Sequence, residues 1–225
     1  YSKIDLPFNG SCATEVDNMT TLIAGNHSIY STKDFINFDI LFRHNFSKDV
    51  RMNDGREDPL GRFWYSSMSE DGSRPVGAIF CYDPKSGVNK QVFKGLYIPN
   101  SICFNPKKRC GYFGDSHLGR IWSFDYTKDC PQIDCFLDFP DKNSVPDGAF
   151  VDNHGHIWVA EWGGGQVAKF SGDGQLIKTI KLPVSRVTCP IVYNDYLIVT
   201  SARVGLGSGA LKNEPNAGDT FIIKT

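Results

Sequence analysis

Short aromatic and apolar runs, separated by turn residues, recur along the whole chain. Polar turns are followed by aromatic strand patterns, and a glycine then opens an alternating or apolar run, at residues 77–84, 119–126 and 165–174. The runs are rich in Phe, Tyr, Trp, Val and Ile, and no window sustains the apolar period of about 3.6 residues that a helix shows. The pattern predicts several short strands in each unit and excludes a solenoid of helices.

These units repeat with a fixed period. Residues 58–64 return as residues 152–158, and residues 105–113 stand halfway between them with two residues inserted, so the period is 47 residues. Two weaker copies flank the three clear ones, which brings the number of units to five. Strand repeats of about 40 to 50 residues are typical of β-propeller blades. Residues 1–225 are therefore predicted to form one all-β propeller domain, because no linker or low-complexity tract divides them.

Polar residues occupy one shared position in these units. Asn53, Asn100 and Asp147 each stand five residues before a polar turn and lie one repeat apart. The innermost strand of every blade lines the channel of a propeller, so residues at one repeat position converge there. The same rule places Cys12 and Cys189 in this ring. Taken singly, each Asn or Asp beside Gly or Pro could also be an ordinary turn former.

Side-chain oxygens gathered at the mouth of a channel suit a divalent metal ion. Amide and carboxylate oxygens are hard ligands for Ca²⁺, Mg²⁺ or Mn²⁺, and a carboxylate also accepts Zn²⁺. Histidine ligands are not evident, since His154 and His156 lie on a turn and the strand after it, where exposed histidines are expected. The ring therefore predicts one oxygen-ligated divalent cation.

Several motifs stand in order over nearly the whole chain. They occupy residues 51–64, 99–101, 115–116, 146–148, 158–167 and 182–203. In these motifs and their spacing the chain resembles the SMP-30, gluconolactonase and regucalcin family. The resemblance implies a six-bladed propeller, a divalent metal at the channel mouth, and hydrolysis of a sugar lactone to the aldonic acid.

The resemblance also implies roles for individual residues. Asn100 and Asp147 match metal ligands, and Asp147 matches the general base as well. Arg51 and Asn53 match substrate contacts. An acidic substrate contact falls at the pair Glu70 and Asp71, where ungapped counting from Arg51 favours Asp71. Solvated surface carboxylates are the alternative for this pair.

One element of the family pattern is missing at the front of the chain. The family completes its metal site with a Glu from the first strands, and nothing before Cys12 resembles that motif. Roughly one blade, on the order of 50 residues, is expected to be absent, so the sequence is interpreted as part of a longer protein. A chain complete at this length would have five blades and a site short of one carboxylate.

A lactonase mechanism follows from these assignments. A metal would polarise the carbonyl and activate water, Asp147 would serve as ligand and proton acceptor, and Arg51 and Asn53 would orient the substrate. The competing class is a non-enzymatic propeller that binds Ca²⁺, a sugar or a protein. Such a protein often shows an exposed aromatic patch, whereas three of the four tryptophans occupy matching strand positions, which favours a place in the sheet core.

Composition narrows the function classes further. Lys and Arg number 24 against 25 for Asp and Glu, a net charge of −1, which argues against nucleic acid or a polybasic membrane surface as a partner. No stretch approaches the roughly 18 apolar residues of a spanning helix, and residues 1–10 lack the apolar core of a signal peptide. Neither nucleic acid nor a membrane is therefore expected as a partner, and the small-molecule partner, a sugar lactone, is what the resemblance implies.

Cysteine usage bears on the compartment. Most of the seven cysteines lie within apolar runs, which favours buried, reduced thiols in a cytoplasmic protein. Cys130 and Cys135 could close a small loop in an oxidising compartment. Four Asn-x-Ser/Thr sequons stand at Asn9, Asn18, Asn26 and Asn45. They keep a secreted origin as the minority alternative.

Overall fold

The computed structural model describes residues 4–17 and 19–225, so the predicted sequon at Asn18 lies outside the described residues. Five antiparallel sheets follow one another along the chain, each built from strands consecutive in sequence. One short helix, α1 (Ser208–Asn213), precedes the last strand. No helix in the described part of the chain is long and apolar enough to cross a membrane.

Four of the sheets have four strands and the last has three. The first sheet contains β1 (Gly10–Asp17), β2 (Thr20–Gly25), β3 (Ser28–Thr32) and β4 (Asp39–Arg43). The second contains β5 (Val50–Glu57), β6 (Phe63–Ser69), β7 (Gly77–Asp83) and β8 (Val88–Leu96). The third contains β9 (Pro99–Asn105), β10 (Cys110–Asp115), β11 (Arg120–Asp125) and β12 (Ile133–Asp138). The fourth contains β13 (Val145–Val151), β14 (Ile157–Trp162), β15 (Gln166–Phe170) and β16 (Leu176–Lys181), and the fifth β17 (Val187–Tyr193), β18 (Tyr196–Ser201) and β19 (Thr220–Lys224).

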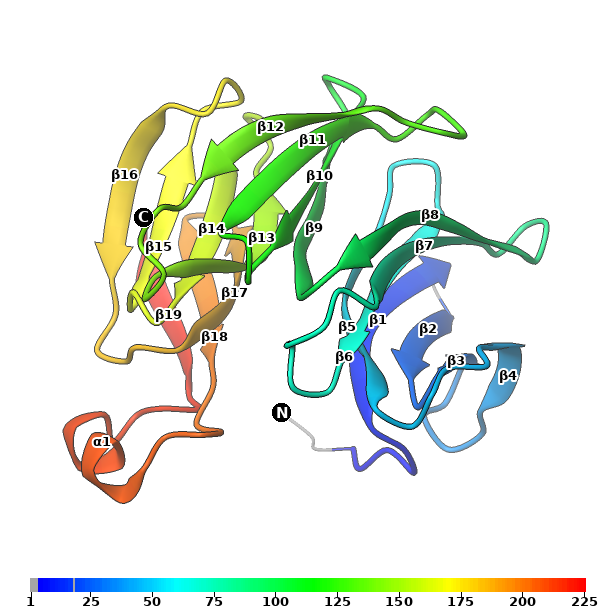
Figure 1. Ribbon diagram of the computed structural model, residues 1–225, viewed down its shortest axis with the longest axis horizontal. Helices are drawn as coiled ribbons and strands as arrows, with labels where there is room; N and C mark the ends of the chain where they lie inside the picture. The colour runs from blue at the N-terminus through cyan, green and yellow to red at the C-terminus, as the bar shows by residue number, and fades with distance from the viewer. Residues whose placement is uncertain (1–3, 18) are drawn as a thin grey trace.

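The sheets stand around a common centre (Figure 1), where the first strand of each sheet contacts the first strand of the next. β1 lies against β5, β5 against β9, β9 against β13, and β13 against β17. The outer strands β4, β8, β12 and β16 lie at the periphery. The predicted all-β propeller of five repeats is therefore confirmed, whereas the sixth blade that the resemblance implies stays a prediction.

Apolar side chains fill the spaces between neighbouring sheets. Four buried clusters occur among the described residues, one for each pair of successive sheets. Trp64 belongs to the cluster between the second and third sheets, and Trp158 to the one between the fourth and fifth. All seven cysteines are free thiols, of which Cys81 and Cys103 are buried whereas Cys130 and Cys135 are exposed. Sheet-to-sheet packing thus explains why the strands carry so many aromatic residues.

The polar turns that mark the repeat hold the sheets by their side chains. Asp58 is buried, and its Oδ1 accepts hydrogen bonds from the backbone N–H groups of Leu60 (2.9 Å) and Arg62 (3.0 Å). Its Oδ2 accepts from Arg62 Nε (2.7 Å) and from the indole Nε1 of Trp64 (2.8 Å). One carboxylate therefore closes the turn and fixes the buried tryptophan that follows it.

Every innermost strand contains at least one extra residue relative to the strand beside it. The shifts in register fall between Gly10 and Cys12, Met52 and Gly55, Asn100 and Cys103, Pro146 and Ala149, and Val187 and Cys189. Such β-bulges break the alternation of side chains and turn them in new directions, often beside active sites. The bulges coincide with the predicted ring, so its members sit where the strands no longer alternate regularly.

The turn at Asp58 generates a stability prediction. Asp58→Ala leaves Arg62 Nε and the Trp64 indole N–H without their acceptor, although Arg62 Nη2 keeps the Tyr126 carbonyl, so we expect the free energy of unfolding to fall by about 2–4 kcal/mol. Urea unfolding followed by tryptophan fluorescence measures the change. The matched control is Asp129→Ala, whose side chain is 98% exposed and whose loss should leave the unfolding midpoint unchanged. Equal midpoints for the two variants would contradict a structural role for Asp58.

Candidate functional site

The sequence-predicted site residues line one cavity of about 760 Å³ at one end of the central channel. Arg51 and Asn53 reach it from β5, Asn100 from β9, Asp147 from β13, and Asp71 from the loop after β6. This end of the channel is called the mouth here. The residues meet because the innermost strands start at the mouth and carry their bulges there.

A chain of hydrogen bonds runs across the wall of the cavity from sheet to sheet. Arg51 Nη1 donates to Asn53 Oδ1 (2.8 Å), and Asn53 Nδ2 donates to Asn100 Oδ1 (2.8 Å). Asn100 Nδ2 donates to Ser116 Oγ (2.8 Å), which in turn donates to the carbonyl oxygen of Pro146 (2.6 Å). The chain links the second, third and fourth sheets and ends directly before Asp147. The orientation of each amide is thereby fixed.

Asp147 has an unusual electrostatic environment. Burial, followed by the nearby carboxyl of Asp54, raises the pKa of Asp147 to about 8, although the Gly148 N–H and the Arg51 guanidinium act to lower it. Burial also raises the pKa of Asp54, whose Oδ2 accepts from the Ile102 N–H (2.8 Å). Two carboxyls thus share the centre with the guanidinium groups of Arg51 and Arg56, and a further positive charge placed there would favour the ionised forms of the carboxyls.

The donor atoms at this centre fit a hard divalent cation. Asn100 Oδ1 accepts only one hydrogen bond among the described residues and keeps a second lone pair. Asp147 adds a carboxylate whose ionisation a cation would favour. Amide and carboxylate oxygens are the ligands that Ca²⁺ prefers, and the carboxylate also suits Zn²⁺. Asn100 and Asp147 are therefore the residues that could hold a metal.

The acidic pair on the rim divides its contacts. The Glu70 carboxylate lies 3.8 Å from Arg51 Nε, and its side chain is 59% exposed. The Asp71 carboxylate accepts from the backbone N–H (3.0 Å) and the hydroxyl (2.7 Å) of Ser73, which lower its pKa to about 2. Both residues line the cavity. Geometry favours Glu70 as the carboxylate beside Arg51, because Asp71 is held within its own turn.

Several cavity residues escaped sequence reasoning. His117, Lys142, Trp162 and Val204 lie at strand ends or on loops around the mouth. Their loops differ in length and composition from sheet to sheet, so the repeat does not single them out. The repeat gives one partial signal for Trp162. Ser116 stands sixteen residues after Asn100, and sixteen residues after Asp147 is position 163, next to Trp162.

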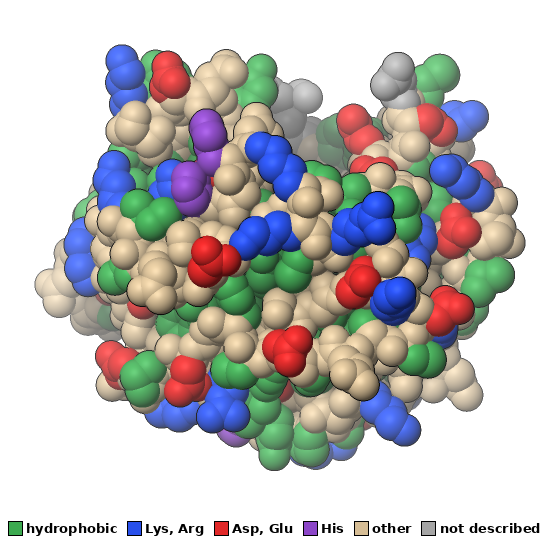
Figure 2. Space-filling model, turned by 90° about the horizontal axis from the view of Figure 1, so that it is seen from above, with side chains coloured by type: hydrophobic (Ala, Val, Ile, Leu, Met, Phe, Trp, Pro, Cys, Tyr) green, Lys and Arg blue, Asp and Glu red, His purple; other side chains and the backbone are tan. Residues whose placement is uncertain are grey.

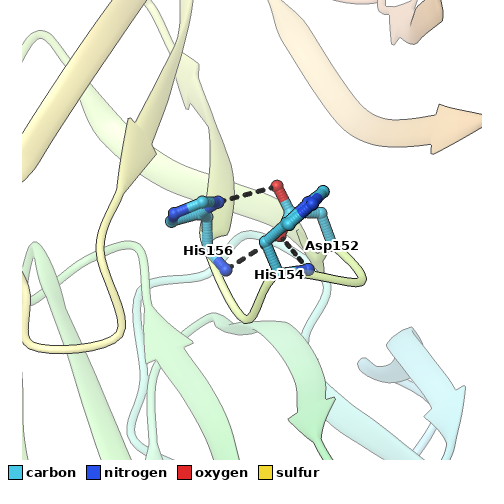
Figure 3. A group of neighbouring side chains, drawn as sticks. All are labelled: Asp152, His154 and His156. Carbon is cyan, nitrogen blue, oxygen red and sulfur yellow. Dashed lines mark hydrogen bonds and ion pairs between the residues drawn. The ribbon is translucent and has the colours of Figure 1, made fainter. Parts of the chain in front are cut away.

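A second group of possible metal ligands lies away from this cavity. Figure 3 shows Asp152, His154 and His156, whose ligand atoms all lie within 4.8 Å of one another. Asp152 Oδ1 accepts hydrogen bonds from the backbone N–H groups of His154 and His156 (2.9 Å each). Asp152 Oδ2 contacts His156 Nδ1 (3.1 Å), Trp158 Nε1 (3.0 Å) and Lys169 Nζ (3.4 Å). Burial acts to raise the pKa of Asp152, but the hydrogen bonds from Trp158 and His156 outweigh it and lower the pKa to about 2.

These contacts reproduce, in the fourth sheet, the turn at Asp58 in the second sheet. In both turns the carboxylate binds two backbone N–H groups and the indole of a core tryptophan. The turn follows the end of β13, whereas Asp147 lies near its start. His154 is exposed as predicted, whereas His156 is half-buried, with its Nδ1 against Asp152. The carboxylate is thus occupied by structural partners at the far end of the channel.

Surface charge is mixed on the face drawn in Figure 2. On the face seen in Figure 2, Lys and Arg side chains alternate with Asp and Glu, and no large area carries one sign alone. The observation agrees with the net charge of −1. Long-range electrostatic attraction of a polyanion would need a concentrated basic surface, which this face does not offer.

Fold and site together define a class of protein, a β-propeller with asparagine, aspartate and arginine side chains at the mouth of its channel. Residues 1–203 match the family model described as the SMP-30/gluconolactonase/LRE-like region. The chain belongs to this family.

Individual relatives agree with this membership. L-arabinolactonase of Azospirillum brasilense is 33% identical over 182 residues, which cover 78% of this chain and 60% of that protein. A putative sugar lactone lactonase of Rhizobium meliloti is 31% identical, over 97% of this chain and 76% of that protein. The solved structure of a calcium-binding protein, regucalcin, from Agrobacterium tumefaciens superposes with a TM-score of 0.89 at 30% identity, covering 97% of this chain and 76% of that one.

The raised pKa of Asp147 predicts a pH-dependent stability in metal-free protein. Between about pH 4, the pKa of an unfolded Asp, and about pH 8, the carboxyl is protonated in the folded chain and ionised in the unfolded chain. Unfolding therefore releases a proton, and stability falls as the pH rises through this window. Asp147→Asn removes the titration, so its stability relative to the parent should grow by about 1–3 kcal/mol from pH 5 to pH 8.

Urea unfolding in EDTA at pH 5, 6, 7 and 8 measures this difference. Asp129→Asn, an exposed carboxyl far from the cavity, serves as the control and should differ from the parent by the same amount at every pH. A constant difference for Asp147→Asn would mean that Asp147 is already ionised in the folded chain at pH 5.

Proposed function

We propose that this protein hydrolyses a sugar lactone of the aldonolactone type, similar to gluconolactone, to the aldonic acid. One observation carries the proposal: a single repeat position brings Asn53, Asn100 and Asp147 into one cavity beside Arg51. The names of the relatives from Azospirillum and Rhizobium, both lactonases, support the same chemistry. The match covers 60% of the length of the first of these, so activity and substrate are proposals for this chain.

Arg51 and Asn53 are arranged to bind the substrate. Both N–H groups of Arg51 Nη1 are used, on Asn53 Oδ1 and on the carbonyl of Met52 (2.9 Å), which leaves the two N–H groups of Nη2 for a ligand. Asn53 Nδ2 is likewise used, on Asn100 Oδ1 and on the carbonyl of Pro99 (3.0 Å). Asn53 therefore offers its Oδ1 as an acceptor. A sugar hydroxyl can donate to Asn53 and accept from Arg51 at once.

Asp147 is the proposed proton acceptor. The Asp147 carboxylate removes a proton from the attacking water while the oxygen of that water bonds to the lactone carbonyl carbon. The bond between the carbonyl carbon and the ring oxygen then breaks. Returning the same proton to the ring oxygen completes the aldonic acid and restores the carboxylate. A divalent cation held by Asn100 and Asp147 would supply Lewis acidity and stabilise the ionised form of Asp147.

The identity of the metal is part of the proposal. Ca²⁺ is the first candidate, since regucalcin from Agrobacterium is described as calcium-binding and the donors are oxygens. Zn²⁺ is the second, with Mn²⁺ and Mg²⁺ as further alternatives. The same description favours one competing function, a propeller that binds Ca²⁺ without catalysis. In both cases Asn100 and Asp147 would be ligands, and turnover alone separates the two.

We also propose that a sixth sheet completes the ring. One face of the fifth sheet exposes Ile191, Tyr193, Tyr196 and Ile222. Tyr193 stands opposite Tyr196, and Ile191 and Ile222 flank Ile198 on the same face. The opposite face of that sheet packs into the core against the fourth sheet. Apolar sheet faces are normally covered. The resemblance places a further carboxylate ligand in such a sheet, so assays should compare this chain with a longer one that includes it.

A reducing, cytoplasmic location is the remaining part of the proposal. Seven free thiols support it, because such thiols persist where disulfides do not form.

Turnover of D-glucono-1,5-lactone and other aldonolactones tests the mechanism. We expect Asp147→Asn and Asn100→Ala each to lower kcat/KM by at least about 100-fold, since each removes a proposed ligand and the former also the base. Acid release is followed in a pH-stat with EDTA-treated protein and with Ca²⁺, Zn²⁺, Mn²⁺ or Mg²⁺ restored. Asp129→Asn should match the parent. Unchanged turnover in Asp147→Asn at saturating metal would refute its role, and metal binding without any turnover would favour the non-catalytic propeller.

The two rim carboxylates give a separate prediction. Because Glu70 lies beside Arg51 and Asp71 is held by Ser73, Glu70→Gln should raise KM about 3- to 10-fold with little change in kcat, as expected for a contact equal in ground and transition states. Asp71→Asn should have the smaller effect. Steady-state kinetics on one lactone compares the variants directly, and a larger rise in KM for Asp71→Asn would assign the contact to Asp71 instead.

A further inference from the structure

The cavity has an apolar wall beside the polar centre. Val145 and Trp162 from the fourth sheet, with Ala202 and Val204 after the fifth sheet's β18, form this apolar wall. Trp162 is half-buried, whereas Val204 is 75% exposed. None of the four takes part in the hydrogen-bond chain from Arg51 to Pro146, so the proposed hydrolysis assigns them no task.

One arginine behind the wall holds it in place. The Arg186 guanidinium lies over the Trp162 ring, 5.1 Å from its centroid, and its Nη1 donates to the carbonyl oxygen of Val204. The backbone N–H of Ala202 donates to the Arg186 carbonyl (2.8 Å). Arg186 does not line the cavity, whereas Trp162 does. Trp162 therefore borders the cavity while the Arg186 guanidinium packs on its ring and holds the plane of the indole.

The cavity falls in the size range of pockets that hold ligands larger than one monosaccharide. Pockets of about 300–1,000 Å³ enclose drug-sized ligands, and this one measures about 760 Å³. Arg51, Asn53 and Asp147 would engage one ring at the centre. The space that remains is bounded by the apolar wall and by two exposed polar side chains, His117 and Lys142.

These two side chains are well placed to meet hydroxyl groups. The His117 ring stacks on Tyr97 with centroids 4.2 Å apart, which fixes its plane. Lys142 Nζ donates one hydrogen bond, to the carbonyl of Leu118 (3.0 Å), and has further N–H groups to offer. A flat aromatic surface with polar donors beside it suits a ligand that has both a C–H face and hydroxyl groups, as a sugar ring does.

We propose that Trp162 and the apolar wall form a second subsite for a sugar ring, so that the substrate class is the lactone of an oxidised disaccharide. The proposal rests on the proposed function only in placing the lactone ring at Arg51, Asn53 and Asp147. The second ring lies with its C–H face on the Trp162 indole, and its hydroxyls contact Lys142 and His117. The subsite binds and positions the substrate and takes no part in bond breaking.

Binding and turnover are measured side by side. Isothermal titration calorimetry compares cellobionate with gluconate, the product acids, and pH-stat kinetics compares their 1,5-lactones. We expect the parent protein to favour the disaccharide ligand by about tenfold or more in both measurements, the scale of one good stacking contact. Trp162→Ala should remove most of this preference, whereas Trp162→Phe, which keeps a flat ring, should retain much of it.

A second variant protects the test against loss of folding. Val204→Glu places a charge on the wall at an exposed position and should also reduce the preference for the disaccharide. Thermal unfolding identifies any variant that no longer folds. Dihydrocoumarin, an aryl lactone, forms a third arm of the comparison. If Trp162→Ala lowered the turnover of dihydrocoumarin but not that of the disaccharide lactone, Trp162 would serve an aryl group and the sugar subsite would be overturned.

The outcomes separate this inference from the proposed function. Turnover of both sugar lactones without a preference, or an equal loss for both in Trp162→Ala, would overturn the second subsite and leave the lactonase standing. Tighter binding of cellobionate that depends on Trp162, without turnover of any lactone by this chain or by the longer chain that includes the sixth sheet, would support the subsite and overturn the lactonase.

Discussion

The extra residue in each innermost strand is the constraint on which the rest of the structure depends. A regular strand would point alternate side chains away from the channel, but the bulges let Asn53, Asn100 and Asp147 share the mouth with their neighbours. The same positions tie sheet to sheet, since Asn53 donates to Asn100 and the Ser101 hydroxyl donates to the Asp147 carbonyl. Contact between neighbouring innermost strands and assembly of the site therefore have one cause.

The charged side chains of Arg56 and Asp54 at the centre of the channel form hydrogen bonds to backbone groups. Arg56 Nε donates to the Ile102 carbonyl (3.2 Å) and Nη2 to the Ala149 carbonyl (3.3 Å), so one guanidinium bridges the second, third and fourth sheets. Asp54 beside it accepts from the Ile102 N–H. Burying such groups costs free energy unless they are satisfied. These contacts hold Asp54 near Asp147, and the Asp54 carboxyl adds to burial in raising the pKa of Asp147, where chemistry is proposed.

The sequence predicted the fold and the ring because both follow the repeat. A fixed period of aromatic strands identifies blades, and Asn53, Asn100 and Asp147 mark one position within them. The loop residues that line the mouth could not be predicted from the repeat, because these loops vary in length from sheet to sheet. No repeat position marks Trp162 as a cavity residue, yet it lines the cavity. The contact of Asp71 with Ser73 is equally invisible in a sequence, since it depends on how one short turn closes.

The turns at Asp58 and Asp152 have a consequence for how this scaffold can diverge. Both anchor a core tryptophan at the far end of the channel, away from Asp147. Loops at the mouth contribute little to that anchoring, so insertions there alter ligand choice at small thermodynamic cost. Evolution can thus vary the two ends of the molecule independently. New specificities can arise by changing the loops while the cooperative folding unit stays the same.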